Sequence, residues 1–202
     1  KMLDGFQNIA HLYDHYIFDV SGVLTDGTQV FQGAINCLKT LESEGKQVIM
    51  LSNAPRLPKY TAARLNDSGI NASKMVTSGG FVIDEFKNPK VFKGIRGKCY
   101  KLGDDDNDLW HQDDSQFNFV ENIGDADFFI SNKYFDDISL FDQYIGELEK
   151  ALELNLPCVC ANPDIIVYHG NEMRYPQGYI ADKYENMGGK VYYYGKPHRP
   201  IY

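Results

Sequence analysis

The sequence predicts an α/β protein in which a second α/β unit is inserted into the first. Short apolar runs alternate with amphipathic segments over the first 77 residues, and the spacing of apolar residues changes from about residue 78. The order strand, helix, strand, helix is typical of a parallel sheet with right-handed crossovers. We therefore expect residues 1–77 and 186–202 to form one unit and residues 78–185 to form the insert.

Two strand–helix pairs are expected in the first unit. Residues 16–20 and 47–51 are apolar runs of strand length, typical of buried parallel strands. A helix is predicted over residues 33–44, because apolar residues recur there at helical spacing and a glycine follows. A second helix is predicted over residues 58–69, whose first residue is a proline, a residue tolerated in a first turn.

Several short strands and one long helix are expected in the insert. The candidate strands are residues 99–102, 117–120, 127–131 and 157–161. Residues 141–155 are predicted to be helical, because their apolar residues share one face. Residues 191–194 form a further apolar run, which we assign to the first unit.

The composition indicates a protein with a buried core and an acidic surface. The chain has 202 residues, 43% of them hydrophobic, and a formal net charge of -8. This charge argues against broad binding to nucleic acid or to anionic membranes. No apolar run approaches the roughly 20 residues of a membrane span, and residues 1–15 lack the apolar stretch of a secretory signal. A cytoplasmic location is therefore expected.

The four cysteines form no CxxC pair. They are Cys37, Cys99, Cys158 and Cys160. We interpret them as buried free thiols in a reducing compartment, with zinc binding as the weaker alternative.

A carboxylate and a glycine turn stand at the predicted end of the first strand. Asp19 is followed by the segment Val20-Ser21-Gly22-Val23-Leu24-Thr25. Ligands bind at this edge of open parallel sheets. A carboxylate there can attack phosphorus and form an aspartyl phosphate, and Gly22 lets the loop wrap around a phosphate. The alternative is an ordinary surface acid in a strand-to-helix turn.

Two further polar segments follow predicted strands. Ser52 and Asn53 could hold phosphoryl oxygens through a hydroxyl and neighbouring N–H groups, although both are also favoured helix caps. Lys196 lies in a Gly-Lys-Pro segment and could offset the charge of a phosphate, although a solvated lysine in a turn is the simpler alternative. Each segment alone is weak evidence for a phosphate site. The order of the three segments along the chain is much more specific.

This order resembles the haloacid dehalogenase superfamily, and more closely subfamily IIA, whose cap lies between the second and third motifs. That subfamily includes p-nitrophenyl phosphate and nucleotide phosphatases. The resemblance implies a three-layer, Rossmann-like core with a parallel sheet and an α/β cap. It makes Asp19 the nucleophile and Ser52, with Asn53 beside it, the phosphoryl-binding segment. Lys196 would be the motif lysine, and Asn162 and Asp164 would lie on the substrate side of the cap.

The same resemblance implies a phosphoric monoester hydrolase that needs Mg²⁺. Asp19 and the backbone carbonyl of Ser21 would be metal ligands. The expected partner is a small phosphorylated metabolite, such as a sugar phosphate or a nucleotide, and pairing of two chains through the cap is possible. Which metabolite is bound stays open.

Ser21 departs from the pattern of the superfamily, where an aspartate usually protonates the leaving oxygen and later activates water. A serine hydroxyl is a poor acid and a poor base, and general acid–base help typically contributes about 10²–10⁴-fold. We therefore expect a slow enzyme. The alternatives are a non-catalytic phosphometabolite-binding protein and a structural or partner-binding protein.

An acidic motif that completes the metal site should follow Lys196 by several tens of residues. The sequence ends at Tyr202, so we expect it to be a fragment. The acidic clusters at residues 104–108 and 124–127 precede Lys196 and are interpreted as solvated turns. A calcium loop is the alternative for the first of them.

Overall fold

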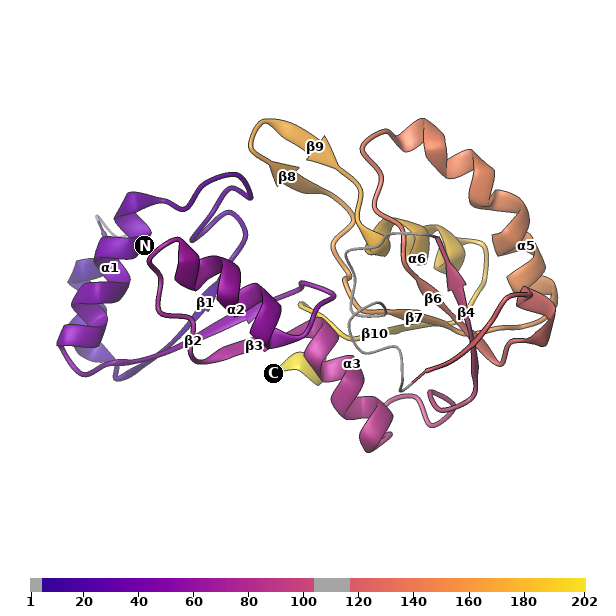
Figure 1. Cartoon of the computed structure of the whole chain (residues 1–202), viewed down its shortest axis with the longest axis horizontal. Helices are drawn as coiled ribbons and strands as arrows, with labels where there is room; N and C mark the ends of the chain where they lie inside the picture. Colours follow the sequence, from indigo (N-terminus) through magenta and orange to yellow (C-terminus); the bar gives the residue numbers. More distant parts are fainter. Residues whose placement is uncertain (1–4, 104–116) are drawn as a thin grey trace.

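Three sheets organise the chain in this computed structural model, which describes residues 5–103 and 117–202 (Figure 1). The acidic cluster at residues 104–108 lies outside the described residues. The strands are β1 (His15–Asp19), β2 (Gln47–Ser52), β3 (Met75–Thr77), β4 (Lys98–Leu102), β5 (Asn118–Val120), β6 (Phe128–Ser131), β7 (Cys158–Cys160), β8 (Val167–His169), β9 (Glu172–Arg174) and β10 (Val191–Tyr193).

The helices alternate with these strands. The α-helices are α1 (Gln32–Ser43), α2 (Pro58–Asp67), α3 (Ser78–Lys87), α5 (Ile145–Glu153) and α6 (Gln177–Asn186). The short 3-10 helices are η1 (Phe6–Asn8), η2 (Ala10–Leu12), η4 (Ile123–Asp125), η5 (Ile138–Tyr144) and η6 (Arg199–Ile201).

The first sheet has the order β1-β2-β3, and all of its strands are parallel. Helices α1 and α2 pack on one face, where Leu38 and Leu65 meet Met50 in a buried cluster. On the opposite face Ile17 and Val76 are 64% and 38% exposed. The described residues thus supply a sheet and one helical layer of this unit. Parallel pairing brings the carboxyl ends of all three strands to one edge.

The second sheet has the order β10-β7-β6-β4-β5 and is also parallel throughout. Helix α3 packs on one face through Val82 and Ile83, and α5 and α6 cover the other through Leu148 and Ile180. Three layers result, with α5 and α6 above the sheet and α3 below it in Figure 1. The central strands β6 and β7 are nearly continuous apolar runs and are buried throughout, because both faces of this sheet are covered.

The α/β class and the predicted strands and helices are confirmed. Gly45 follows α1 with a φ of 74°, as expected for a C-terminal cap, and Pro58 occupies the first turn of α2. The helix predicted over residues 141–155 is α-helical only from Ile145, because the preceding turn is the 3-10 helix η5. All four cysteines are free; Cys99, Cys158 and Cys160 are buried and Cys37 is half-buried.

The assignment of residues 191–194 to the first unit is wrong. Strand β10 pairs with β7 in the second sheet, with Val191 opposite Cys158. A short apolar run reveals that a strand is buried, but it carries no information on which sheet buries it. The chain returns to the first sheet only after Tyr194, whose own N–H still donates to Cys160.

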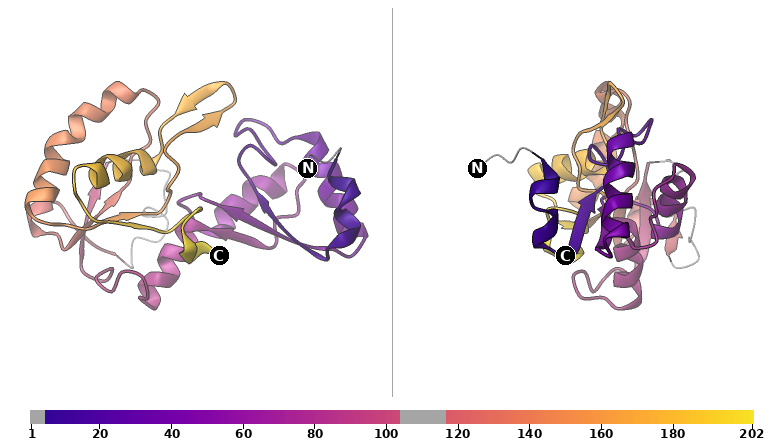
Figure 2. Two further views of the ribbon diagram at one scale, coloured as in Figure 1. Left: turned by 180° about the vertical axis from the view of Figure 1, so that it is seen from behind. Right: turned by 90° about the vertical axis from the view of Figure 1, so that its left-hand side faces the viewer.

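A hairpin reaches from the second unit towards the first. Strands β8 and β9 pair in antiparallel fashion, and both views of the ribbon show this hairpin extending from the orange lobe towards the loop after β1 (Figures 1 and 2). The two units therefore meet on two sides, at the edge of the first sheet and at this hairpin. No helix among residues 5–103 and 117–202 has the length and apolar character needed to cross a membrane.

A buried carboxylate fixes the link between α3 and the second sheet. Glu85 is 2% exposed, and its Oε1 accepts the N–H groups of Lys90 (2.5 Å), Val91 and Phe92 (3.0 Å). These donors belong to the turn that leaves α3. One side chain therefore satisfies three backbone groups that would otherwise be poorly solvated.

We expect Glu85→Ala to lower the free energy of unfolding by about 2–3 kcal/mol, because buried N–H donors lose their acceptor. Denaturant titration of the variant measures this change. The matched control is Glu153→Ala, which removes an exposed carboxylate and should change stability by less than about 1 kcal/mol. Equal effects of the two substitutions would contradict this account of Glu85.

Candidate active site

Asp19 ends β1 at the carboxyl edge of the first sheet. Its Oδ1 accepts the N–H of Val20 at 2.7 Å and also bonds to Nζ of Lys196. Its Oδ2 receives no hydrogen bond from the described residues, and the side chain is 46% exposed. One carboxylate oxygen is therefore held in place while the other is open to a ligand.

The loop after Asp19 is wound by backbone hydrogen bonds. The carbonyl of Val20 accepts the N–H groups of Leu24 (2.9 Å) and Thr25 (3.2 Å), and Gly22 donates to the carbonyl of Thr25 at 2.7 Å. Gly22 has a φ of 77°, a left-handed conformation that favours glycine, which confirms the predicted turn. Ser21 is exposed on this loop. Its hydroxyl is a poorer proton carrier than the carboxylate of an aspartate would be at this position.

Ser52 and Asn53 follow β2 at the same edge and are both buried. Ser52 Oγ accepts the N–H of Ala54 at 3.1 Å, which leaves the hydroxyl proton for a ligand. Both polar atoms of the Asn53 side chain have hydrogen-bond partners. Its Nδ2 donates to Oδ1 of Asp164 (2.8 Å) and to the carbonyl of Lys196 (3.0 Å), and its Oδ1 accepts the N–H of Lys196 (2.7 Å).

Lys196 is brought to Asp19 by a close-packed turn. Its Nζ donates to the carbonyl of Leu51 at 3.1 Å as well as to Asp19. The preceding Gly195 is packed so tightly that a Cβ there would overlap Pro163 and lie 2.7 Å from Asn53 Oδ1. After the turn, the ring of His198 stacks on Tyr193 with centroids 4.4 Å apart, an ordinary packing role.

Asp164 comes from the second unit and lies beside this turn. The preceding Asn162 accepts the N–H of Asp164 through its Oδ1 at 3.0 Å, which shapes the loop. Gly178, at the start of α6, lets the backbone of Pro163 and Asp164 approach closely, because a Cβ there would overlap both. Burial raises the pKa of the Asp164 carboxyl, and the negative charge of Asp19 adds to this, against the opposing effects of Asn53 and Lys196.

The β8–β9 hairpin makes a second contact with the first unit, at the loop after β1. Nε2 of His169 lies 2.8 Å from the carbonyl oxygen of Gly27, and Gly170 donates to the carbonyl of Asp26 at 2.8 Å. Gly27 has a φ of 92°, and a Cβ there would overlap the His169 ring. Asp26 itself accepts the N–H groups of Gln29 and Thr28, and these bonds lower its pKa to about 2.

Beyond Ser21 and Ser52 lies a cavity of about 170 Å³. Its walls come from the loop after β1 and from α2, and they include Arg56 and Arg64. Positive side chains thus line the space next to the carboxyl edge of the first sheet. Such an environment favours a ligand that carries negative charge.

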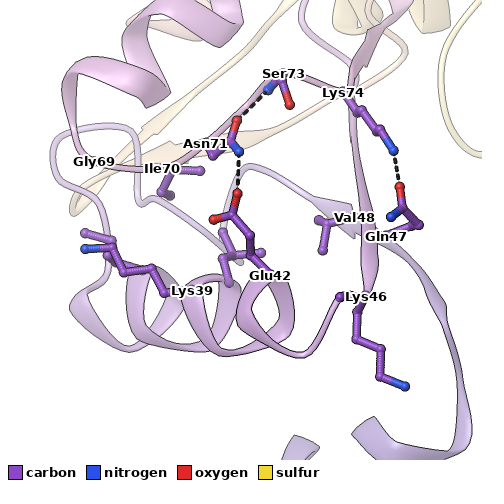
Figure 3. A pocket seen from close by; sticks show the side chains of 13 residues that line it. Lys39, Glu42, Lys46, Gln47, Val48, Gly69, Ile70, Asn71, Ser73 and Lys74 are labelled. Atoms are coloured by element: carbon purple, nitrogen blue, oxygen red, sulfur yellow. Dashed lines mark hydrogen bonds between the residues drawn. The ribbon is translucent and has the colours of Figure 1, made fainter.

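A larger cavity, of about 350 Å³, lies at the opposite edge of the same sheet (Figure 3). Several of its polar side chains are paired with one another or with neighbours. Asn71 donates to Glu42 at 2.9 Å, Lys74 bonds to Gln47, and Lys46 bonds to Asp14 at 3.0 Å. Because it lies at the amino ends of β2 and β3, this cavity is remote from Asp19.

The oxygen donors at the carboxyl edge of the first sheet suit a hard cation. Mg²⁺ takes oxygen ligands and is usually held by one or two carboxylates together with waters. Oδ2 of Asp19 and the backbone carbonyl of Ser21 are donors of this kind. Within the described residues no group of three or more His, Cys, Asp and Glu side chains is placed to hold a metal. These two oxygens are the donors at this edge that would hold such an ion.

The structure brings together five of the predicted site residues, namely Asp19, Ser52, Asn53, Asp164 and Lys196. Gly22 and Ser21 lie on the adjoining loop, and Asn162 positions Asp164 without reaching the other side chains. The sequence analysis missed the contact of His169 with Gly27, because His169 belongs to none of the motifs. It also missed Arg56 and Arg64, which carry no motif.

Residues 16–109 match the sequence profile described as haloacid dehalogenase-like hydrolase. No curated protein matches the chain. Among solved structures, a hydrolase of the haloacid dehalogenase-like family from Brucella suis 1330 is 28% identical, with a TM-score of 0.82. The match covers 100% of this chain and 73% of that one.

Two more distant structures have the same fold. The p-nitrophenyl phosphatase of Archaeoglobus fulgidus is 20% identical with a TM-score of 0.67, over 93% of this chain and 70% of that one. A glycerol phosphate phosphatase of Mycobacterium tuberculosis, in complex with magnesium, is 18% identical with a TM-score of 0.69. That match covers 96% of this chain and 58% of the other. At these identities the likeness concerns the fold alone.

We expect Asn53→Asp to lower the free energy of unfolding by about 2–4 kcal/mol, because a buried carboxylate would then face Asp164 and the carbonyl of Lys196. Thermal and denaturant unfolding measure the loss. Asn71→Asp is the matched control: Asn71 also donates to a carboxylate, that of Glu42, but at an exposed position. The control should cost less than about 1 kcal/mol. Similar losses at both positions would show that Asn53 does not organise the site.

Proposed function

We propose that this chain, whose residues 16–109 match the model of haloacid dehalogenase-like hydrolases, hydrolyses the phosphate monoester of a small metabolite through an aspartyl phosphate on Asp19. The observation that carries this proposal is the meeting of Asp19, Ser52 and Lys196 at one sheet edge. A free carboxylate oxygen, a free hydroxyl proton and an ammonium group converge there.

Attack by Asp19 is the first step of the proposed reaction. Oδ2 of Asp19 attacks phosphorus while Oδ1 stays bonded to Val20 and Lys196. The Ser52 hydroxyl and the Lys196 ammonium balance charge on the transferring oxygens, which is the main task in phosphoryl transfer. Water then hydrolyses the acyl phosphate and frees Asp19. Mg²⁺, held by Asp19 and the carbonyl of Ser21, would supply further positive charge at these oxygens.

The second unit acts in this proposal as a cap. It comprises the insert from residue 78 to 185 together with β10. Asp164 contacts Asn53 and the β8–β9 hairpin contacts Gly27, so the second unit touches both segments that carry the proposed site residues. The cavity lined by Arg56 and Arg64 supports an anionic substrate of small size, such as a sugar phosphate or a nucleotide.

A non-catalytic phosphometabolite-binding protein is the second candidate, and Ser21 is the observation that favours it. No carboxylate stands two residues after Asp19, so the usual proton carrier of the superfamily is missing. Leaving-group protonation must then come from another side chain, or the turnover of poor leaving groups is slow.

We expect the full-length protein that carries this chain to hydrolyse p-nitrophenyl phosphate in the presence of Mg²⁺. Asp19→Asn should reduce kcat by at least about 10³-fold, because an amide cannot form the acyl phosphate. Release of p-nitrophenol measures the rate. Asp14→Asn changes an exposed carboxylate at the other end of β1 and should leave the rate within about twofold. Retained activity in the Asp19 variant would refute Asp19 as the nucleophile.

Binding without turnover separates the second candidate from the first. Inorganic phosphate with Mg²⁺ should raise the Tm in either case, because any ligand selective for the folded state stabilises it. Only the enzyme should also release product from phosphate monoesters. A raised Tm with no product from any ester tested would favour the binding protein, and an unchanged Tm would argue against both.

A further inference from the structure

The cavity beside α2 extends away from the place where a phosphate would react. Asp19 and Lys196 are not among the residues that line it, whereas Ser21 and Ser52 belong both to the proposed site and to the cavity wall. The wall also includes Arg64, which lies in the last turn of α2. One bound molecule can therefore touch Ser52 with one group and the wall along α2 with another.

One face of α2 forms a wall of this cavity. Thr61, Arg64 and Leu65 of α2, and Ser68 directly after it, are spaced by three or four residues and line the cavity together. Residues with this spacing share one side of a helix. At a rise of about 1.5 Å per residue, the wall from Thr61 to Ser68 is about 10 Å long. This length leaves room for a second chemical group beyond a phosphate bound at Ser52.

The lining is positively charged, although the chain as a whole is acidic. The formal net charge of the sequence is -8, yet the described residues that line the cavity include two arginines and no aspartate or glutamate. The guanidinium of Arg64 makes no hydrogen bond or ion pair with another described residue, whereas Lys46, Lys150 and Arg174 are paired with carboxylates. A guanidinium can donate two parallel hydrogen bonds to a carboxylate or a phosphate.

A buried hydroxyl on the same wall also lacks a partner. Oγ1 of Thr61 is buried and has no hydrogen-bond partner among the described residues. By contrast, the hydroxyls of Thr25, Thr28 and Ser68, which line the same cavity, all donate to oxygens of the protein. Buried polar atoms without a partner are unfavourable and few in native structures. An anionic oxygen in the cavity would supply the acceptor that Thr61 lacks.

We propose that the cavity along α2 binds a second anionic group of the substrate. The inference rests on the proposed phosphatase function. The reacting phosphate lies at Asp19 and Ser52, while Arg64 and the hydroxyl of Thr61 donate hydrogen bonds to a carboxylate or a second phosphate of the same molecule. The substrate is then a phosphate monoester with two anionic groups, such as a phosphorylated hydroxy acid or a sugar bisphosphate.

The test compares pairs of esters that differ in the second anionic group, with the full-length protein and Mg²⁺. The first pair is glycerate and glycerol, each phosphorylated on a terminal carbon, which differ by a carboxylate in place of a hydroxymethyl group. The second pair is the bisphosphate and a monophosphate of fructose. Release of inorganic phosphate measures kcat/KM. We expect the doubly anionic ester to be preferred by about tenfold or more in at least one pair, because hydrogen bonds between charged groups are strong. The pair that shows the preference tells whether the second group is a carboxylate or a phosphate.

Two variants with a matched control assign the preference to the cavity. Arg64→Gln removes the guanidinium and should reduce the preference to less than about twofold. Lys59→Gln removes one positive charge from the same helix, at a residue that does not line the cavity, and should leave the preference unchanged. A preference set by the overall charge of the helix would instead fall equally in both variants.

Thr61→Val gives a second measurement, which does not depend on turnover. Valine keeps the shape of the side chain and removes the hydroxyl, so the preference for the doubly anionic ester should fall. Without ligand, the Tm should stay the same or rise, since the hydroxyl has no partner to lose. A lower Tm would show that the protein itself already bonds this hydroxyl, and would remove Thr61 from the proposed subsite.

Two results would overturn the inference alone. Equal or undetectable rates within both pairs would show that no second anionic group is bound. A preference that survives Arg64→Gln, or that falls equally in Lys59→Gln, would show that the cavity does not bind this group. The phosphatase function stands in both cases if p-nitrophenyl phosphate, which carries no second anionic group, is hydrolysed. Failure of the parent protein to hydrolyse any phosphate ester would overturn the phosphatase function and this inference together.

Discussion

The side-chain amide of Asn53 is the interaction on which the arrangement of the site depends. It joins three segments that are far apart in sequence, since its donors reach Asp164 and the carbonyl of Lys196 and its acceptor takes the Lys196 N–H. With this amide satisfied, the Lys196 side chain is directed to Asp19, and Asp164 is held against the same edge. A buried amide whose hydrogen bonds are all made holds its partners in one arrangement. A buried amide that lacks some of these bonds would lower the stability of the fold.

Two units of different construction meet around this amide. The first sheet supplies the proposed nucleophile, Asp19, at the end of a paired strand, where its side chain is half-exposed. The second unit supplies Asp164 from a loop that is tightly packed against Gly178 and Gly195. The β8–β9 hairpin adds a separate contact at Gly27. The two units are therefore joined at two places, through Asn53 and through Gly27.

The sequence predicts that Asp19, Ser52 and Asn53 lie at one sheet edge, because the pattern that carries this prediction is local. Asp19, Ser52 and Asn53 each follow an apolar run, and parallel strands bring their carboxyl ends together. Strand β10 is an exception, because its apolar residues would fit either sheet. Its pairing with β7 assigns it to the second sheet. Two contacts could not be predicted from the sequence either: that of His169 with Gly27, and the bonds from Glu85 to the turn after α3. Both depend on backbone atoms of irregular segments, whose positions no periodicity encodes.

The covalent intermediate gives the most direct test of the central claim, that Asp19 attacks phosphorus. The full-length protein would be mixed with a phosphate ester and Mg²⁺, quenched in acid within the first turnover, and its peptides analysed by mass spectrometry. The account predicts a phosphoryl group on Asp19 that hydroxylamine removes, as expected for an acyl phosphate. A phosphoryl group on another residue, or product formed with no modified peptide at any quench time, would contradict it.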